Sequence, residues 1–267
     1  RTPNPLPLRR AVADILEVSD EADVGGLVED GTSNNPYGDH ALQVCKLSLY
    51  IAKATDLSDE NIQDLGVASM FHDMGYAARE GADPKNGEPG FAPPFERHGA
   101  AGARMLLKQR GFHQAKIHRA LSALEHHRDY THPTGKPGLF ARIIRIAEDY
   151  SNMSARRGGG LNPHETLARM AAGAGTRYDP VLMQLFVNLM GKYPPGTLLD
   201  VEIPLTMGTH QFVLMSSSLV RDPESFDKPL CRLIQLPDGT DCPPSYAGKV
   251  IDLMKRPHRI VSVRSQI

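Results

Sequence analysis

The chain has 267 residues, of which 40% are hydrophobic and 23% are charged, and its formal net charge is −1. This composition is ordinary for a globular protein, and the small charge predicts no binding to a nucleic-acid polymer. No apolar run reaches the roughly 18 residues of a membrane span, so we expect no membrane partner. The three cysteines, Cys45, Cys231 and Cys242, form no zinc motif or disulfide framework, which favours reduced thiols in a cytoplasmic protein.

A mainly helical domain is predicted over residues 1–195. Its apolar spacing predicts helices near residues 6–18, 41–54, 61–78, 95–110, 114–127, 138–155, 164–173 and 179–191. Ser58 and Asn162 are expected to cap two of these helices. A loop rich in glycine, proline and asparagine is expected over residues 81–94.

The character of the sequence changes near residue 196. Segments rich in valine, isoleucine, leucine and phenylalanine alternate there with turn residues, which predicts strands at 198–205, 210–220, 230–236 and 259–263. A helix is expected near 245–255. We therefore predict a small β-rich C-terminal appendage over residues 196–267.

Polar residues occur at the apolar edges of several predicted helices. His40 lies one turn before an apolar stripe that includes Val44, which places it at the inward edge of its helix's first turn. In "MFHDMGY", His72 continues the 3,4 spacing of its helix and faces the core, with Asp73 about 100° away. A single inward histidine is usually a hydrogen-bonded core residue, so these positions alone do not indicate a ligand site.

Further polar side chains repeat this arrangement. His98 opens "HGAAGARML", His126 and His127 end the next helix, and Glu148-Asp149 interrupt "ARIIRIAEDYSNM". Imidazoles and carboxylates that converge in a helical core are typical of metal sites. Glu148 shares a face with apolar residues and is favoured as the inward ligand. Asp149 shares its face with Arg142 and Arg145, and Arg145 is placed to form a surface i,i+4 pair with it. Asp149 nevertheless remains an alternative ligand.

The ordered set resembles the HD-GYP family of cyclic di-GMP phosphodiesterases, within the HD-domain metallohydrolases. The resemblance spans roughly residues 30–220. It rests on the lone His40, the "HD" pair with Gly75 two residues on, "HGAAG", "HH", and the helix "ARIIRIAEDYSNMSARR", and it extends to "YPPGTLLDV".

The resemblance implies two metal ions that share Asp73. Position by position, it assigns one ion to His40, His72, Asp73 and Glu148, and the other to Asp73, His98, His126 and His127. A third metal in some members uses a glutamate where this chain has Pro36, so two ions are expected. Iron, or else manganese, suits such ligands.

The chain also departs from the family's pattern. Tyr76 replaces a lysine that holds the scissile phosphate, and Arg128 replaces a glutamate. "DYTHP" is shorter than the family's loop, so the GYP tyrosine is absent or replaced by His132. Of two basic residues after the late carboxylate, Arg157 matches the first, with Arg156 beside it, and Gly160 stands at the second.

Three functions follow from this resemblance. The first is a metal-dependent cyclic di-GMP phosphodiesterase, in which a hydroxide that bridges the metals attacks phosphorus and gives pGpG or GMP. His72 and Asp73 would serve this reaction, and Arg157, Arg156, Tyr76 and His132 would contact substrate. The second is a weak or inactive cyclic di-GMP receptor or scaffold, with a signalling protein as partner. The third is an HD phosphohydrolase for another phosphoester.

Overall fold

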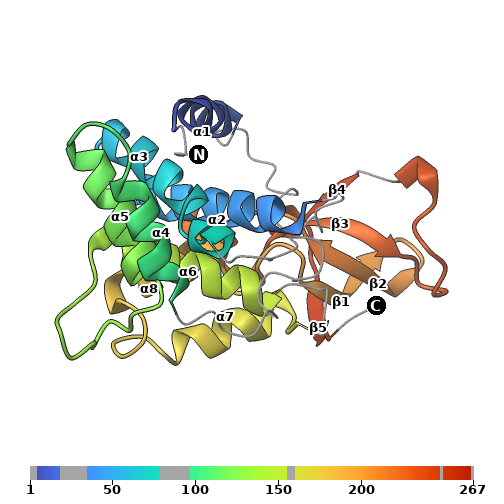
Figure 1. Ribbon diagram of the computed structural model, residues 1–267. Helices are drawn as coiled ribbons and strands as arrows, with labels where there is room; N and C mark the ends of the chain where they lie inside the picture. The colour runs from blue at the N-terminus through green and yellow to red at the C-terminus, as the bar shows by residue number, and fades with distance from the viewer. Residues whose placement is uncertain (1–4, 19–34, 79–96, 155–159, 247–248, 266–267) are drawn as a thin grey trace. The chain divides into compact units, whose positions relative to one another are not determined.

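A computed structural model describes residues 5–18, 35–78, 97–154, 160–246 and 249–265 (Figure 1). The chain divides into two compact units. The first consists of the described parts of residues 1–20, 31–153 and 172–185, and the second of those of 154–171 and 186–267. The domain boundary that we expected after residue 195 stays a prediction.

The expected mainly helical fold with a small β appendage is confirmed. The helices are α1 (Leu6–Val18), α2 (Pro36–Lys53), α3 (Asp59–Met70), the 3-10 helix η2 (Met74–Ala78), α4 (His98–Leu107), α5 (Gln114–Glu125), α6 (Leu139–Ser154), α7 (Pro163–Ala171) and α8 (Pro180–Met190). Both expected caps are present, because Ser58 accepts a hydrogen bond from the Asn61 amide and Asn162 from the Glu165 amide. The loop expected over residues 81–94 lies outside the described residues.

Helix α2 begins earlier than the sequence analysis predicted. The side chain of Asn35 caps it by accepting a hydrogen bond from the Gly38 amide at 3.1 Å, and Pro36 occupies the first turn. His40 therefore lies in the second turn, although it still faces the core. The Asn-Pro pair has the same role as the one that starts α7, so the start could have been read from the sequence.

The helix predicted over residues 61–78 is interrupted at the "HD" pair. Helix α3 ends at Met70, a turn spans Phe71–Asp73, and η2 follows. Backbone hydrogen bonds change to i,i+3 spacing, as from Met74 to Phe71 and from Tyr76 to Asp73. The turn carries Gly75 up to α4, where a Cβ would collide with the carbonyl oxygen of His98. Periodicity did not predict this break, because its cause is a contact with a distant segment.

The core of the first unit is apolar and fully buried. Helix α2 contributes Val44, Leu47 and Ile51, as the predicted stripe required, and α6 contributes Ile143 and Ile144. Helix α2 packs against α3, and α4 packs against both α5 and η2. This packing brings the turn after α3, the start of α4 and the end of α5 together.

The second unit contains a five-stranded antiparallel sheet in the order β4-β3-β2-β1-β5. The strands are β1 (Leu198–Leu205), β2 (Gly208–Ser216), β3 (Leu230–Gln235), β4 (Val250–Asp252) and β5 (Arg259–Arg264). Leu199, Val201 and Leu214 are among the buried residues of its core. No helix in the described part of the chain is long and apolar enough to cross a membrane.

The helix expected near 245–255 is wrong. The described residues there form two 3-10 turns, Pro244–Tyr246 and Leu253–Lys255, with β4 between them. Strand β4 pairs with Leu230–Arg232 of β3, and the Asp252 side chain then accepts a hydrogen bond from the Met254 amide at 3.0 Å. Strand pairing therefore overrides the local helical pattern.

Candidate metal centre

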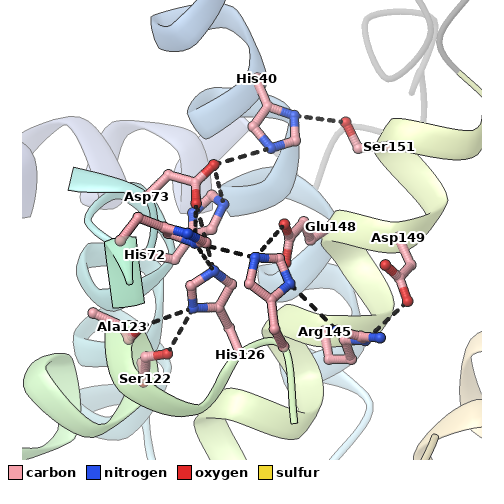
Figure 2. Close-up of polar contacts among 12 residues, drawn as sticks. His40, His72, Asp73, Ser122, Ala123, His126, Arg145, Glu148, Asp149 and Ser151 are labelled. Atoms are coloured by element: carbon pink, nitrogen blue, oxygen red, sulfur yellow. Dashed lines mark hydrogen bonds and ion pairs between the residues drawn. The ribbon is translucent and has the colours of Figure 1, made fainter. Parts of the chain in front are cut away.

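Five segments of the first unit bring imidazoles and carboxylates together (Figure 2). The side chains are His40 from α2, His72 and Asp73 from the turn after α3, His98 at the start of α4, His126 and His127 just after α5, and Glu148 from α6. Most of them are buried, whereas the side chain of His127 is half exposed. Residues far apart in sequence thus form one polar cluster inside an apolar core.

Asp73 stands at the centre of this cluster. Its Oδ1 lies 3.2 Å from His98 Nε2 and 3.4 Å from His126 Nε2. Its Oδ2 lies 3.4 Å from His72 Nε2 and 3.9 Å from His40 Nε2. One carboxylate therefore presents each of its oxygens to a different pair of imidazoles, which is the arrangement that a ligand shared by two ions requires.

The ligand atoms form two groups that share Asp73. The His40 group consists of His40, His72, Asp73 and Glu148, and the His98 group of Asp73, His98, His126 and His127; within each group the atoms lie within 4.8 Å of one another. In the His98 group, the Nε2 atom of His98 is 3.1 Å from that of His126 and 3.1 Å from that of His127. With metal–nitrogen bonds of about 2.0–2.2 Å, donors at right angles lie about 3 Å apart.

Several of these atoms also lack ordinary partners. His72 Nε2, Asp73 Oδ1 and Glu148 Oε2 are buried and have no hydrogen-bond partner. Leaving such atoms unsatisfied costs about 1–3 kcal/mol each, and a cation would satisfy all three. Neutral imidazoles and carboxylates are suitable ligands for divalent transition metals, so the residues present fit the metal that the sequence predicted.

Hydrogen bonds at Nδ1 orient three of the histidine rings. The Nδ1–H of His40 donates to Ser151 Oγ at 3.2 Å, and that hydroxyl in turn donates to Gln43. The Nδ1–H of His72 donates to the carbonyl of Ser69 at 2.5 Å. The Nδ1–H of His126 donates to the carbonyls of Ala123 at 3.0 Å and of Ser122 at 3.2 Å (Figure 2). Each contact leaves the Nε2 lone pair directed at the cluster, as in metal sites.

Glu148 and Asp149 have different environments. Glu148 Oε1 lies 3.7 Å from His127 Nε2, inside the cluster. Asp149 lies in neither group. Its Oδ2 accepts from Tyr178 at 2.8 Å and pairs with the guanidinium groups of Arg145 at 2.9 Å and Arg177 at 3.1 Å. The expected Arg145–Asp149 pair exists, but both residues are buried, so it is not a surface pair.

When no metal is bound, burial and neighbouring charges shift the pKa values of residues in the cluster. Burial raises the pKa of Glu148 to about 8. Burial also acts to lower the pKa of His72, but the neighbouring Asp73 carboxylate outweighs it and raises that pKa to about 9. Despite its burial, Asp73 is held well below its usual pKa by His72. The metal-free protein therefore holds protons at neutral pH where metal binding needs lone pairs.

The remaining predicted residues have separate positions. The Tyr76 ring stacks on His98 with centroids 4.4 Å apart, and burial raises its pKa to about 12, so it remains a neutral phenol. His132 is partly buried, joins neither group, and contacts Thr134 at 2.8 Å. Arg156 and Arg157 lie outside the described residues.

The sequence analysis did not predict the polar residues around the cluster, chiefly Ser151, Gln43 and Tyr178. Ser151 lies three residues after Glu148 and therefore on the same face of α6, which is a signal that could have been used. Gln43 lies three residues after His40 and offered the same signal. Tyr178 offered none, because its contact with Asp149 joins separate segments of the chain.

Part of the chain is similar to known proteins. Residues 37–153 match the HD domain family. The chain is 32% identical over 178 residues to the cyclic di-GMP phosphodiesterase PA4108 from Pseudomonas aeruginosa, covering 61% of this chain and 41% of that protein. The chain thus spans less than half the length of this relative.

A solved structure has a similar fold. It is Bd1817, a HDG"Y"P protein from Bdellovibrio bacteriovorus, with a TM-score of 0.53 and 15% identity. The match covers 68% of this chain and 60% of that one. At this identity the likeness concerns the fold.

Proposed function

We propose that this chain is a metal-dependent phosphodiesterase that hydrolyses cyclic di-GMP to pGpG or GMP. The observation that carries the proposal is Asp73, whose two oxygens face separate groups of imidazoles and so can join two metals. The 32% identity to a cyclic di-GMP phosphodiesterase supports the choice of substrate. Two ions per chain, iron or else manganese, would be held by the His40 and His98 groups.

When bound, the metals would supply a lowered pKa for water and positive charge for the phosphoryl oxygens. The residues of the chain would position the metals and the substrate. Asp73 fixes the spacing of the two groups, and Ser151 and the Ser69 carbonyl hold the rings of His40 and His72. Tyr76, stacked on His98, offers a phenolic O–H to substrate in place of the family's lysine. Arg157, with Arg156 beside it, would bind phosphate.

One observation favours a second candidate, a cyclic di-GMP receptor that turns over slowly or not at all. Tyr76 is neutral, so it supplies a hydrogen bond but no charge to the transferring phosphoryl group. Loss of one such stabilising contact can lower kcat by about 100-fold or more. An HD phosphohydrolase for another phosphoester is the remaining candidate.

The test measures turnover and binding with the same protein. Chain purified without oxygen and loaded with Fe²⁺ or Mn²⁺ is incubated with cyclic di-GMP, and pGpG and GMP are quantified by chromatography. We expect product from the wild type and none from Asp73→Asn, which removes the shared carboxylate. Tight binding without product under both metals would favour the receptor. Neither binding nor product would favour another phosphoester.

A further inference from the structure

The Nδ1 atom of His127 contacts a guanidinium group. The Nδ1 atoms of His40, His72 and His126 contact oxygen acceptors instead. Arg145 Nη1 lies 3.3 Å from His127 Nδ1. Arg145 is buried, and its guanidinium is fixed by Asp149 Oδ2 at 2.9 Å from Nε and by Asp129 Oδ1 at 3.6 Å from Nη2. Because Tyr178 also donates to Asp149, Arg145 is attached to a network rather than to one mobile side chain.

The direction of this hydrogen bond determines where the His127 ring carries its proton. A guanidinium has donors and no acceptor, so Nδ1 of His127 must accept. A neutral imidazole that accepts at Nδ1 carries its hydrogen at Nε2. Yet Nε2 is the atom that lies 3.1 Å from His98 Nε2 and faces the His98 group. A metal there needs the lone pair of that same atom, so the Arg145 contact opposes ligation by His127.

The other oriented rings show the opposite polarity. His40, His72 and His126 each donate from Nδ1 to an oxygen, a hydrogen bond that is kept when Nε2 binds metal. Two of these rings belong to the His40 group. The His98 group therefore contains the one ligand, among these four rings, whose partner works against metal binding.

We propose that Arg145 lowers the affinity of the His98 group for its metal, the second ion, by holding His127 in the tautomer that carries its hydrogen on Nε2. Arg145 is thus a positioning residue that acts through His127 and sets how readily the second ion exchanges. The inference rests on the proposed two-metal centre, and on the fixed geometry of the Arg145–Asp149 pair.

The test titrates Mn²⁺ into chelator-stripped protein by equilibrium dialysis with metal analysis, and follows formation of the coupled Mn²⁺ pair by electron paramagnetic resonance. Arg145→Lys keeps a donor, whereas Arg145→Gln offers Nδ1 a carbonyl acceptor. Since partners behind a ligand commonly change metal affinity by about 10–100-fold, Arg145→Gln should bind its second Mn²⁺ about tenfold more tightly than wild type. Arg145→Lys should match the wild type.

Arg142→Gln is the matched control, because Arg142 lies on the same helix and pairs with Asp179, outside the cluster. It should leave both affinities unchanged. An equal or weaker second affinity in Arg145→Gln would overturn the inference and leave the two-metal centre standing. Absence of any Mn²⁺ from the wild type would instead overturn the proposed function.

A second measurement needs no variant. Nitrogen-15 spectra of the metal-free wild type should show His127 with its hydrogen on Nε2, against Nδ1 for His126. A His127 ring protonated on Nδ1 would overturn the inference whatever the variants do. This readout separates the tautomer from any loss of folding in Arg145→Gln.

Discussion

Glu148 and Asp149 show how neighbouring carboxylates on one helix acquire different roles. About 100° of helical rotation separates them, so Glu148 enters the His40 group while Asp149 turns to Tyr178 and two guanidinium groups. The sequence alone left both carboxylates as candidate metal ligands. The apolar face of α6 favoured Glu148, and that preference agrees with the geometry. Its metal role stays a prediction.

Replacing each carboxylate by its amide separates these two positions. Glu148→Gln should lower the affinity of the His40 group for Mn²⁺ by at least about tenfold, because an amide supplies no charge to the cation. Asp149→Asn keeps an acceptor for Tyr178 and should change the first affinity by less than about threefold. Equilibrium dialysis with metal analysis measures both. Equal losses in the two variants would contradict the assignment of Glu148.

At the scale of elements, apolar periodicity and capping residues predicted which segments form helices. They did not predict the helix ends that shape the site. The stripe through Val44 and the cap at Ser58 depend on neighbours in sequence, so they were visible. The break after Met70 and the strand at Val250–Asp252 depend on contacts with α4 and β3, which no local window contains. The cluster of histidines could be predicted because each lay at an apolar edge. Of the groups that orient them, Ser151 offered a signal through its helical face, whereas the backbone carbonyls that hold His72 and His126 offered none.

The break after α3 predicts a difference between two glycines that face each other. In Gly75→Ala the new Cβ would collide with the backbone of His98, so η2 and α4 must separate. Such overpacking costs about 1–3 kcal/mol, and the shift should also weaken Mn²⁺ binding by the His98 group. In Gly102→Ala the nearest atom is 3.2 Å away, which requires a smaller adjustment.

Chemical denaturation and Mn²⁺ titration of the two variants test this difference. Gly75→Ala should lose stability and second-site affinity together, while Gly102→Ala should retain most of both. A Gly75→Ala variant with wild-type affinity for both ions would show that the close approach does not position His98.

At the scale of the whole molecule, the cluster joins segments from α2 to α6 and therefore links the stability of the first unit to proton and metal binding. Without metal, the folded-state pKa values of His72 and Glu148, about 9 and about 8, exceed their ordinary values of 6.5 and 4.5. Groups with raised pKa values stabilise the fold while protonated, and that contribution is lost as pH rises through the folded-state pKa.

The metal-free protein should therefore melt at a lower temperature as pH rises from about 6.5 to about 9, by roughly 5 °C for a domain of this size. Over the same window the Mn²⁺-loaded protein should show no such fall, because the metal replaces the protons and binds more tightly as they leave. Calorimetry at constant ionic strength compares the two. A metal-free melting temperature that stays level or rises would contradict the raised pKa values.

The contact between Gly75 and the first residue of α4 has a consequence for reading other genomes. Any side chain at the second position after an "HD" pair would push this turn away from the segment that carries the next histidine. Among chains with an HD pair, glycine there should mark those able to assemble a second metal group of this geometry. Chains with a bulkier residue should be restricted to one ion or to another arrangement. The residue at this position can therefore be used to sort unassigned HD sequences before any of them is expressed.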